Sequence, residues 1–219
     1  MLGLFPSPSD RQFESYLMSH PSIVLAMADK AQRDEAQSEA RALQSAVDKI
    51  GLEAYFNPKI AFVTGPANAK KSLVEFFDYN CVHCRNSYPA VQKFYNARRA
   101  DTRFAFFEFP IFGKDSEKAA RAALAARRQP DKYVAFHFAL MGEDGEIGDG
   151  QIADAARKAG LDLARLESDM RDPALGRQIA AAHALATRTG VSGTPFFIVN
   201  GTAHEGEIDD ALLKKMIGS

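Results

Sequence analysis

The stretch of sequence that decides the fold is Ser72-Leu-Val-Glu-Phe-Phe-Asp-Tyr-Asn-Cys-Val-His-Cys-Arg85. Four of its first six residues are apolar and lie on both sides of the chain, which predicts a strand that is covered on both faces. Two cysteines follow, and after them a helical pattern places Tyr88, Val91 and Tyr95 on one face. Residues 102–109 are again mostly apolar and predict another strand. The order strand, helix, strand indicates a parallel pair of strands joined by a right-handed crossover.

The remaining segments complete an α/β domain around this unit. Residues 115–189 are almost entirely helical in pattern, and breaks at glycine and proline divide them into four or five helices. Asn200-Gly201 is a dipeptide typical of a hairpin turn. Short strands are expected at residues 60–63 and 196–199, and a last helix at residues 208–217. The sequence therefore predicts a strand–helix–strand unit, a helical insertion, a hairpin and a final helix.

The N-terminal segment, residues 9–56, is predicted to be helical with one break at His20-Pro21. Short apolar stripes lie on both sides of this break, and their members are Phe13, Tyr16, Leu17, Ile23, Val24 and Met27. Residues 28–42 are good helix formers but mostly polar, and the stripe resumes only weakly at Leu43, Val47 and Ile50. We therefore expect a stalk, with an N-terminal helical arm at residues 1–58 and a compact domain at residues 59–219.

Composition and charge argue against several classes of partner. The chain has 27 basic and 28 acidic residues and a formal net charge of −1. Neither nucleic acid nor an anionic membrane is therefore expected as a partner. No apolar run approaches the roughly 18 residues that span a bilayer. The segment Met1–Asp10 lacks the basic-then-apolar layout of a signal peptide, so we expect either a cytosolic protein or the mature form of an exported one.

All of the thiol chemistry lies in Cys81-Val-His-Cys84, because the chain has two cysteines. A thiol at the start of a helix lies close to unpaired backbone N–H groups, so the pKa of Cys81 should fall below its ordinary value of about 8.5. Cys81 would then attack a disulfide as a thiolate. Cys84, one turn along, would attack the mixed disulfide and close the Cys81–Cys84 ring. His83 lies between the cysteines and can donate a hydrogen bond or a partial charge to the thiolate.

The alternative is that the cysteine pair is half of a structural zinc site. Such a site needs four ligands. The other candidates are His20, His83, His137, His183 and His204, and the sequence has neither a second Cys-x-x-Cys nor a His-x-x-x-His pair. Of these, His137 and His183 are expected on helix faces and His204 at a surface turn. The position of the pair between a buried strand and a helix favours redox chemistry.

Two motifs carry a resemblance to a known family. Glu75-Phe-Phe-Asp-Tyr-Asn-Cys-Val-His-Cys-Arg85 closely resembles the active-site strand of the DsbA-like branch of the thioredoxin superfamily, and Val191-Ser-Gly-Thr-Pro-Phe-Phe197 is similar to its cis-proline loop. The resemblance covers roughly residues 59–219. It implies a thioredoxin fold with a helical insertion, in which Thr194 and Pro195 face the Cys81 sulfur and bind substrate backbone.

By the same resemblance, Glu75 corresponds to the buried carboxylate that shuttles protons in this family. The alternative is an acid on an edge strand that faces water. Burying a lone carboxylate lowers the stability of the fold, so such a residue is expected only where it has a role. The position of Glu75 in an otherwise apolar strand therefore favours the functional interpretation.

The N-terminal arm indicates which subgroup of DsbA-like proteins the chain resembles. A DsbA-like domain behind a long, Ala-rich helical arm is similar to the suppressor of copper sensitivity protein C (ScsC) family. This resemblance implies a periplasmic protein that self-associates through its arm, with a homotrimer favoured, a membrane reductase as partner and a link to copper tolerance. The alternative is that the arm packs onto its own domain. Short stripes at both ends of a polar helix suit a contact between chains better.

We therefore expect a mature periplasmic thiol–disulfide oxidoreductase that acts as an oligomeric protein disulfide isomerase on disulfide-containing protein substrates. No cofactor is required beyond the redox-active disulfide Cys81–Cys84. Two alternatives stay open. One is a monomeric DsbA-like thiol oxidase, and the other is a copper-binding protein in which Cys81 and Cys84 are soft ligands for Cu(I).

Overall fold

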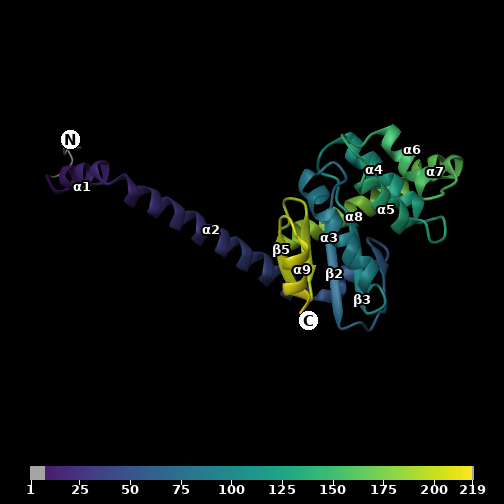
Figure 1. Ribbon diagram of the computed structural model, residues 1–219, viewed down its shortest axis with the longest axis horizontal. Coiled ribbons are helices and arrows are strands. Elements are labelled where there is room, and N and C mark those ends of the chain that lie inside the picture. The colour runs from purple at the N-terminus through teal and green to yellow at the C-terminus, as the bar shows by residue number, and fades with distance from the viewer. Residues whose placement is uncertain (1–7, 219) are drawn as a thin grey trace. The chain divides into compact units, whose positions relative to one another are not determined.

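The computed structural model describes residues 8–218, and these fall into two compact units, one ending at Ala42 and the other beginning at Leu43. The first unit contains α1 (Pro8–Ser19) and the larger part of α2 (Pro21–Ile50), which are separated at the predicted break. The second unit (Figure 1) contains the end of α2, η1 (Leu52–Phe56), β1 (Phe62–Thr64), β2 (Lys71–Phe77), α3 (Val82–Arg98), β3 (Thr102–Glu108), α4 (Lys114–Ala126), α5 (Tyr133–Met141), α6 (Asp149–Lys158), α7 (Leu163–Met170), α8 (Pro173–Thr189), β4 (Phe196–Val199), β5 (Thr202–Glu205) and α9 (Asp210–Ile217).

The second unit is built on a five-stranded sheet in the order β1-β3-β2-β4-β5. Strands β2 and β3 are parallel and are joined through α3, as the strand–helix–strand pattern predicts. Strand β4 runs antiparallel to β2 on its other side, and β5 follows through the predicted hairpin at Asn200-Gly201, where both residues have positive φ. These pairings confirm the thioredoxin fold.

Both faces of the central strand β2 are covered, which explains its nearly continuous apolar sequence. Leu73 and Phe77 face one core, formed with α3, α9 and the helices of the insertion. Val74 and Phe76 face a second core, formed with α8 and η1. Phe76 stacks on Phe107 of β3 in this second core, with ring centroids 4.2 Å apart. Burial on both faces fixes the strand, and with it the position of the cysteines that follow.

The compact unit begins at Leu43, and not near Pro58 as the sequence pattern suggested. Leu43 and Val47 of α2 are buried in the second core, and they are joined there by Tyr55 and Phe56. The Tyr55 hydroxyl also lies 2.8 Å from the Thr189 hydroxyl of α8. A stripe of two residues is enough here because Tyr55 and Phe56 of η1 bury apolar side chains in the same core. The arm is therefore shorter than predicted.

The insertion between β3 and β4 consists of the five helices α4 to α8, which run from residue 114 to residue 189, against a predicted range of 115–189. Helices α4 to α7 gather at one end of the second unit (Figure 1). Within residues 8–218, no helix is both long and apolar enough to cross a bilayer.

Candidate active site

The two cysteines lie at the start of α3, where the sequence places them. Cys81 is the N-cap residue and Cys84 lies in the first turn. Both are reduced, and both residues are almost fully buried. The backbone N–H of Cys81 donates to the carbonyl of Asp78, which ties the cap to the end of β2. The strand thus positions the helix start, and the helix start positions the thiols.

The residues on either side of the cysteine pair hold it to the insertion. The Asn80 side chain accepts a hydrogen bond from the Ile147 backbone N–H at 2.7 Å and donates to the Ile147 carbonyl at 3.3 Å. The Arg85 guanidinium donates to the carbonyls of Glu143 and Gly145. The same insertion segment therefore contacts the chain just before Cys81 and just after Cys84. No sequence pattern predicts this contact, because its partners lie about 60 residues apart in the chain.

The pKa of Cys81 is lowered to about 5. The largest cause is a hydrogen bond from the Cys84 thiol, and the backbone N–H groups of His83 and Cys84 add to it, while burial opposes it. In the thiol form, Cys81 Sγ donates to the Thr194 carbonyl at 3.1 Å. The buried Thr194 hydroxyl has no partner among the described residues, so it is available to donate to the thiolate. Cys81 is therefore a thiolate at neutral pH, as the helix start predicts.

Cys84 has the opposite character. Burial raises its pKa well above the ordinary value, and the neighbouring thiolate of Cys81 and the carboxyl of Glu75 raise it further. A thiol that stays protonated cannot begin an exchange, but it can resolve one after Cys81 has been consumed. The electrostatics therefore divide the pair into a nucleophile, Cys81, and a resolving cysteine, Cys84.

We expect the thiolate absorbance of the reduced protein to titrate with a midpoint near pH 5, because the hydrogen bonds to Cys81 stabilise its charged form. Replacing Thr194 with valine, which keeps the shape but removes the hydroxyl, should raise this midpoint by about one unit. Cys81→Ser should abolish the transition. A midpoint that Thr194→Val leaves unchanged would show that the hydroxyl does not contact the thiolate.

The imidazole of His83 forms its hydrogen bond with Glu207, which leaves only the charge interaction of the two that the sequence allowed with Cys81. Its imidazole Nδ1 lies 2.6 Å from Glu207 Oε1, which also accepts a hydrogen bond from Asn86 at 2.8 Å. This contact raises the pKa of His83. The expected hydrogen bond from the imidazole to Cys81 is replaced by one from the His83 backbone N–H. The charge of Cys81 adds to the rise in the pKa of His83, after the larger contributions from Glu207 and burial.

The cis-proline loop lies against the nucleophile, as the resemblance implies. The Thr194–Pro195 peptide bond is cis, and Pro195 is buried directly before β4. The hydrogen bond between Cys81 and the Thr194 carbonyl brings together two segments that are 113 residues apart in sequence. This confirms the predicted meeting of Thr194–Pro195 and Cys81. Binding of substrate backbone by this loop stays a prediction.

Glu75 is buried in the middle of β2, and not exposed at an edge. It is 2% exposed and is paired in register with Phe106 of β3 and Phe197 of β4. Its Oε2 has no hydrogen-bond partner among the described residues. Burial therefore raises the pKa of Glu75 to about 8. Glu75 also raises the pKa of Cys84, so the two groups interact electrostatically. A role for Glu75 in moving the proton of Cys84 stays a prediction.

Replacing Glu75 with glutamine should stabilise the reduced protein increasingly as the pH rises from 5 to 8. An acid whose pKa is raised in the folded state binds more protons folded than unfolded, so its contribution to stability falls through this range. Glutamine does not titrate and removes the penalty, which amounts to about 2 kcal/mol or more at pH 8. Urea unfolding of both proteins at pH 5, 6.5 and 8 measures the difference. A difference that is constant with pH would mean that Glu75 is ionised in the folded protein.

A second buried polar cluster lies on the same face of the sheet, and sequence analysis missed it. Glu108 at the end of β3 accepts a hydrogen bond from the Tyr133 hydroxyl at 2.8 Å and a longer one from Tyr79. The Tyr79 hydroxyl also lies 3.0 Å from His137 Nδ1. Burial lowers the pKa of His137 to about 3, so this residue is neutral. His137 therefore lies on a helix face, as expected, and this face of α5 is buried in the core.

The described residues do not support the zinc alternative. Within residues 8–218, no three histidine, cysteine or acidic side chains are placed so that they could hold a metal ion together. His83 contacts Glu207, and His137 is buried with Tyr79. Among residues 8–218, the cysteines are thus a pair of thiols without further ligands of these types.

Comparisons with known proteins agree with this geometry. Residues 72–218 match the family model of the DSBA-like thioredoxin domain. A thioredoxin-like oxidoreductase from Silicibacter pomeroyi is 40% identical, with a TM-score of 0.67 over 74% of this chain and 92% of its own. A periplasmic thioredoxin-like protein from Salmonella enterica serovar Typhimurium is 30% identical, with a TM-score of 0.66 over 76% of this chain and 95% of its own. A linker-deletion variant of ScsC from Proteus mirabilis is 21% identical and shares the fold, with a TM-score of 0.72 over 99% of this chain and 97% of its own.

Among curated relatives, Na(+)/H(+) antiporter NhaA 1 of Salinispora arenicola is 30% identical over 174 residues, which are 78% of this chain and 26% of the antiporter. The chain thus spans about a quarter of the length of the curated relatives that it matches. The family match covers the strand, the cysteine pair, the insertion and the cis-proline loop. The chain therefore belongs to the DsbA-like thioredoxin-domain family, with its cysteine pair at Cys81 and Cys84.

Proposed function

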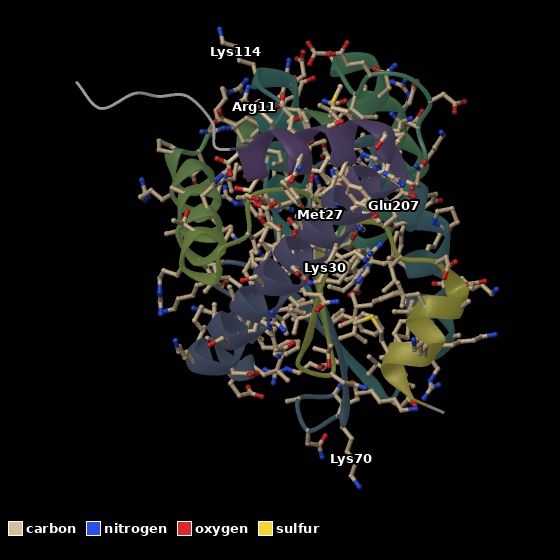
Figure 2. The ribbon with its side chains drawn as sticks, turned by 90° about the vertical axis from the view of Figure 1, so that its left-hand side faces the viewer. Arg11, Met27, Lys30, Lys70, Lys114 and Glu207 are labelled. Atoms are coloured by element: carbon tan, nitrogen blue, oxygen red, sulfur yellow. The ribbon has the colours of Figure 1, made fainter. Side chains whose placement is uncertain are left out.

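We propose that this chain is a periplasmic protein disulfide isomerase whose subunits associate through the arm that ends at Ala42. The observation that carries the proposal is the exposure of large apolar side chains on α1 and at the start of α2. Met18 is 80% exposed, Leu25 66%, Phe13 63% and Met27, labelled in Figure 2, 61%. A concentration of exposed apolar side chains on so short a segment is typical of an interface.

The reaction follows from the different character of the two thiols. The Cys81 thiolate attacks one sulfur of a client disulfide, so that a bond forms between them, the client S–S bond breaks and the second client sulfur leaves as a thiolate. In isomerisation, a client thiolate then attacks the mixed disulfide and Cys81 leaves unchanged. If Cys84 attacks first, it loses its proton, the Cys81–Cys84 disulfide forms and the client is reduced by two electrons. Isomerisation therefore needs no net oxidant, but it needs Cys81 to be reduced.

Association favours isomerisation over simple oxidation. Several Cys81 thiolates around one client raise the effective concentration of the nucleophile at the non-native disulfides of that client. The resemblance to ScsC supports a homotrimer, a periplasmic location and a membrane reductase that returns the cysteine pair to the reduced state. The similarity to a periplasmic thioredoxin-like protein is a second argument for the location.

The experiment that tests this proposal is refolding of a scrambled-disulfide protein by the reduced full-length chain at substoichiometric concentration. We expect native activity to return at a rate that depends on Cys81. Oxidation of a fully reduced client without reshuffling of a scrambled one would instead indicate the alternative, a DsbA-like thiol oxidase.

A second candidate function is binding of Cu(I) by Cys81 and Cys84. The observation that favours it is a pair of reduced thiols close enough to hydrogen-bond, which are soft ligands of the kind that Cu(I) prefers. Titration of the reduced protein with Cu(I) against a colorimetric chelator tests it, with Cys81→Ser as the control. Binding that Cys81→Ser does not weaken would place copper elsewhere.

A further inference from the structure

The segment between β5 and α9 is attached to the first turns of α3, next to the cysteine pair. The buried hydroxyl of Ser87 makes this attachment, because it donates to the carbonyl of His83 at 3.0 Å and accepts from the backbone N–H of Ile208 at 3.0 Å. The imidazole Nε2 of His204 also lies 2.9 Å from the carbonyl oxygen of Glu207. The backbone on both sides of Glu207, which is labelled in Figure 2, is therefore held in place.

The carboxylate of Glu207 contacts His83 from this attachment. Its Oε1 accepts a hydrogen bond from the imidazole Nδ1 at 2.6 Å and another from the side-chain amide of Asn86 at 2.8 Å. The hydrogen bond from His83, and after it the one from Asn86, lowers the pKa of Glu207, so this group is ionised at neutral pH. Ion pairs on a protein surface usually contribute little, because two mobile side chains must be ordered. Here Asn86 and the attached backbone order the carboxylate in advance.

The contact with Glu207 engages the imidazole of a residue that lies between the two cysteines. After Glu207 and burial, the charge of Cys81 also contributes to the pKa of this imidazole, so the two groups are within electrostatic range of each other. The side chain of His83 is 62% exposed, so the solvent leaves it room to turn. A hydrogen bond or a positive charge given to the Cys81 thiolate would stabilise the reduced pair and make the disulfide a stronger oxidant. Glu207 competes with Cys81 for this imidazole, and its negative charge offsets the positive one.

We propose that Glu207 is a positioning residue that holds the His83 imidazole away from the Cys81 thiolate, and thereby makes the Cys81–Cys84 disulfide a weaker oxidant. The inference rests on the proposed function, in which the dithiol opens client disulfides. Because the thiolate receives less stabilisation, the dithiol is a stronger reductant of those disulfides. This property suits a protein that opens non-native disulfides better than one that donates its own disulfide to clients.

Glu207→Ala tests the proposal, because it removes both the negative charge and the hydrogen-bond acceptor. The reduction potential is measured from the equilibrium of the full-length chain with reduced and oxidised glutathione at pH 6. This pH lies below the ordinary histidine pKa of about 6.5, so the imidazole is mostly protonated with or without Glu207. Asp210→Ala is the matched control, since Asp210 is a nearby acid whose partner is Lys93, well beyond the first turn of α3. His83→Ala, alone and combined with Glu207→Ala, completes a double-mutant cycle.

We expect Glu207→Ala to shift the equilibrium constant about threefold toward the dithiol, which corresponds to a rise of about 14 mV in the reduction potential. The midpoint of the thiolate absorbance should fall by about half a unit in the same variant, because both changes come from the same stabilised thiolate. Asn86→Ala, which keeps every charge and only loosens the carboxylate, should change both quantities in the same direction by less. Asp210→Ala should change neither, and in the His83→Ala background the loss of Glu207 should have no larger effect than Asp210→Ala.

An unchanged potential in Glu207→Ala would overturn the proposal, and so would an equal change in Asp210→Ala or a change of opposite sign in Asn86→Ala. A change that persists in the His83→Ala background would also overturn it, because Glu207 would then act through its own charge and not through the imidazole. A wild-type cysteine pair that glutathione can neither oxidise nor reduce would refute the proposed function instead.

Discussion

Replacing Cys84 with serine should turn the protein into a trap that accumulates mixed disulfides with its clients, whereas Cys81→Ser should accumulate none. Cys81 has a pKa of about 5 and is the attacking thiolate, while burial and the neighbouring thiolate hold Cys84 in its protonated form. Without Cys84, the bond between Cys81 and the client persists until an external thiol breaks it. Non-reducing electrophoresis after an acid quench measures the trapped complexes. The expected contrast between the two variants is on the order of a hundredfold, because a neutral thiol is far less nucleophilic than a thiolate.

The double variant Cys81→Ser/Cys84→Ser is the control for complexes that do not depend on either thiol. Reduction of the trapped band should release one client chain for each chain of the protein, since only Cys81 remains to bind it. Trapping of equal amounts by the two single variants would mean that the two cysteines exchange roles, and it would refute the assignment made from their electrostatics.

Much of the catalytic unit could be predicted from sequence because its signals are local. The apolar residues on both faces of β2 require cover on two sides, and the Asn200-Gly201 turn requires positive φ at both residues. The cysteine pair stands where a strand ends and a helix begins, which determines both its geometry and the direction of its pKa shifts. Each of these features depends on residues within about ten positions of one another.

What the sequence did not reveal depends on pairs of residues that are far apart in the chain. Asp78 holds the loop at Ile111 and Phe112, and Asn80 holds Ile147, but neither residue belongs to a recognisable pattern. The cluster of Glu108, Tyr79 and His137 is likewise invisible until β3 and α5 are packed together. Among the buried polar residues, the sequence pattern predicts a special role only for Glu75, because this acid interrupts an otherwise apolar strand.

The arm boundary was misplaced for a related reason. Leu43 and Val47 make a weak stripe on α2, because the surface that completes their core comes from η1 and α8. The position of His83 also depends on a distant partner, since Glu207 is supplied by the segment between β5 and α9. Proximity in sequence to a catalytic thiol therefore did not determine where the imidazole would form its hydrogen bond.

Deleting the residues before Leu43 should leave a folded protein that loses most of its isomerase activity. The compact unit begins at Leu43 and keeps both of its cores, so the truncated chain should unfold in urea with nearly the stability of that unit in the full-length protein. The Cys81 thiolate should still react with small disulfides at an unchanged rate. Refolding of a scrambled client should nevertheless fall by about tenfold or more, because the separated subunits no longer share one client. Light scattering should show the full-length chain as an oligomer and the truncated chain as a monomer.

The position of the cut makes the experiment discriminating. Removing residues up to Pro58 would also delete Leu43, Val47, Tyr55 and Phe56, all of which are buried in the second core. Loss of several such side chains should cost at least about 5 kcal/mol and unfold or severely destabilise the domain. Loss of activity from that longer deletion would therefore say nothing about association. The cut before Leu43 separates the two effects, because it removes the exposed apolar side chains of α1 and α2 and leaves the core intact. A full-length chain that is monomeric, or a truncated chain that isomerises equally well, would return the protein to the role of a DsbA-like thiol oxidase.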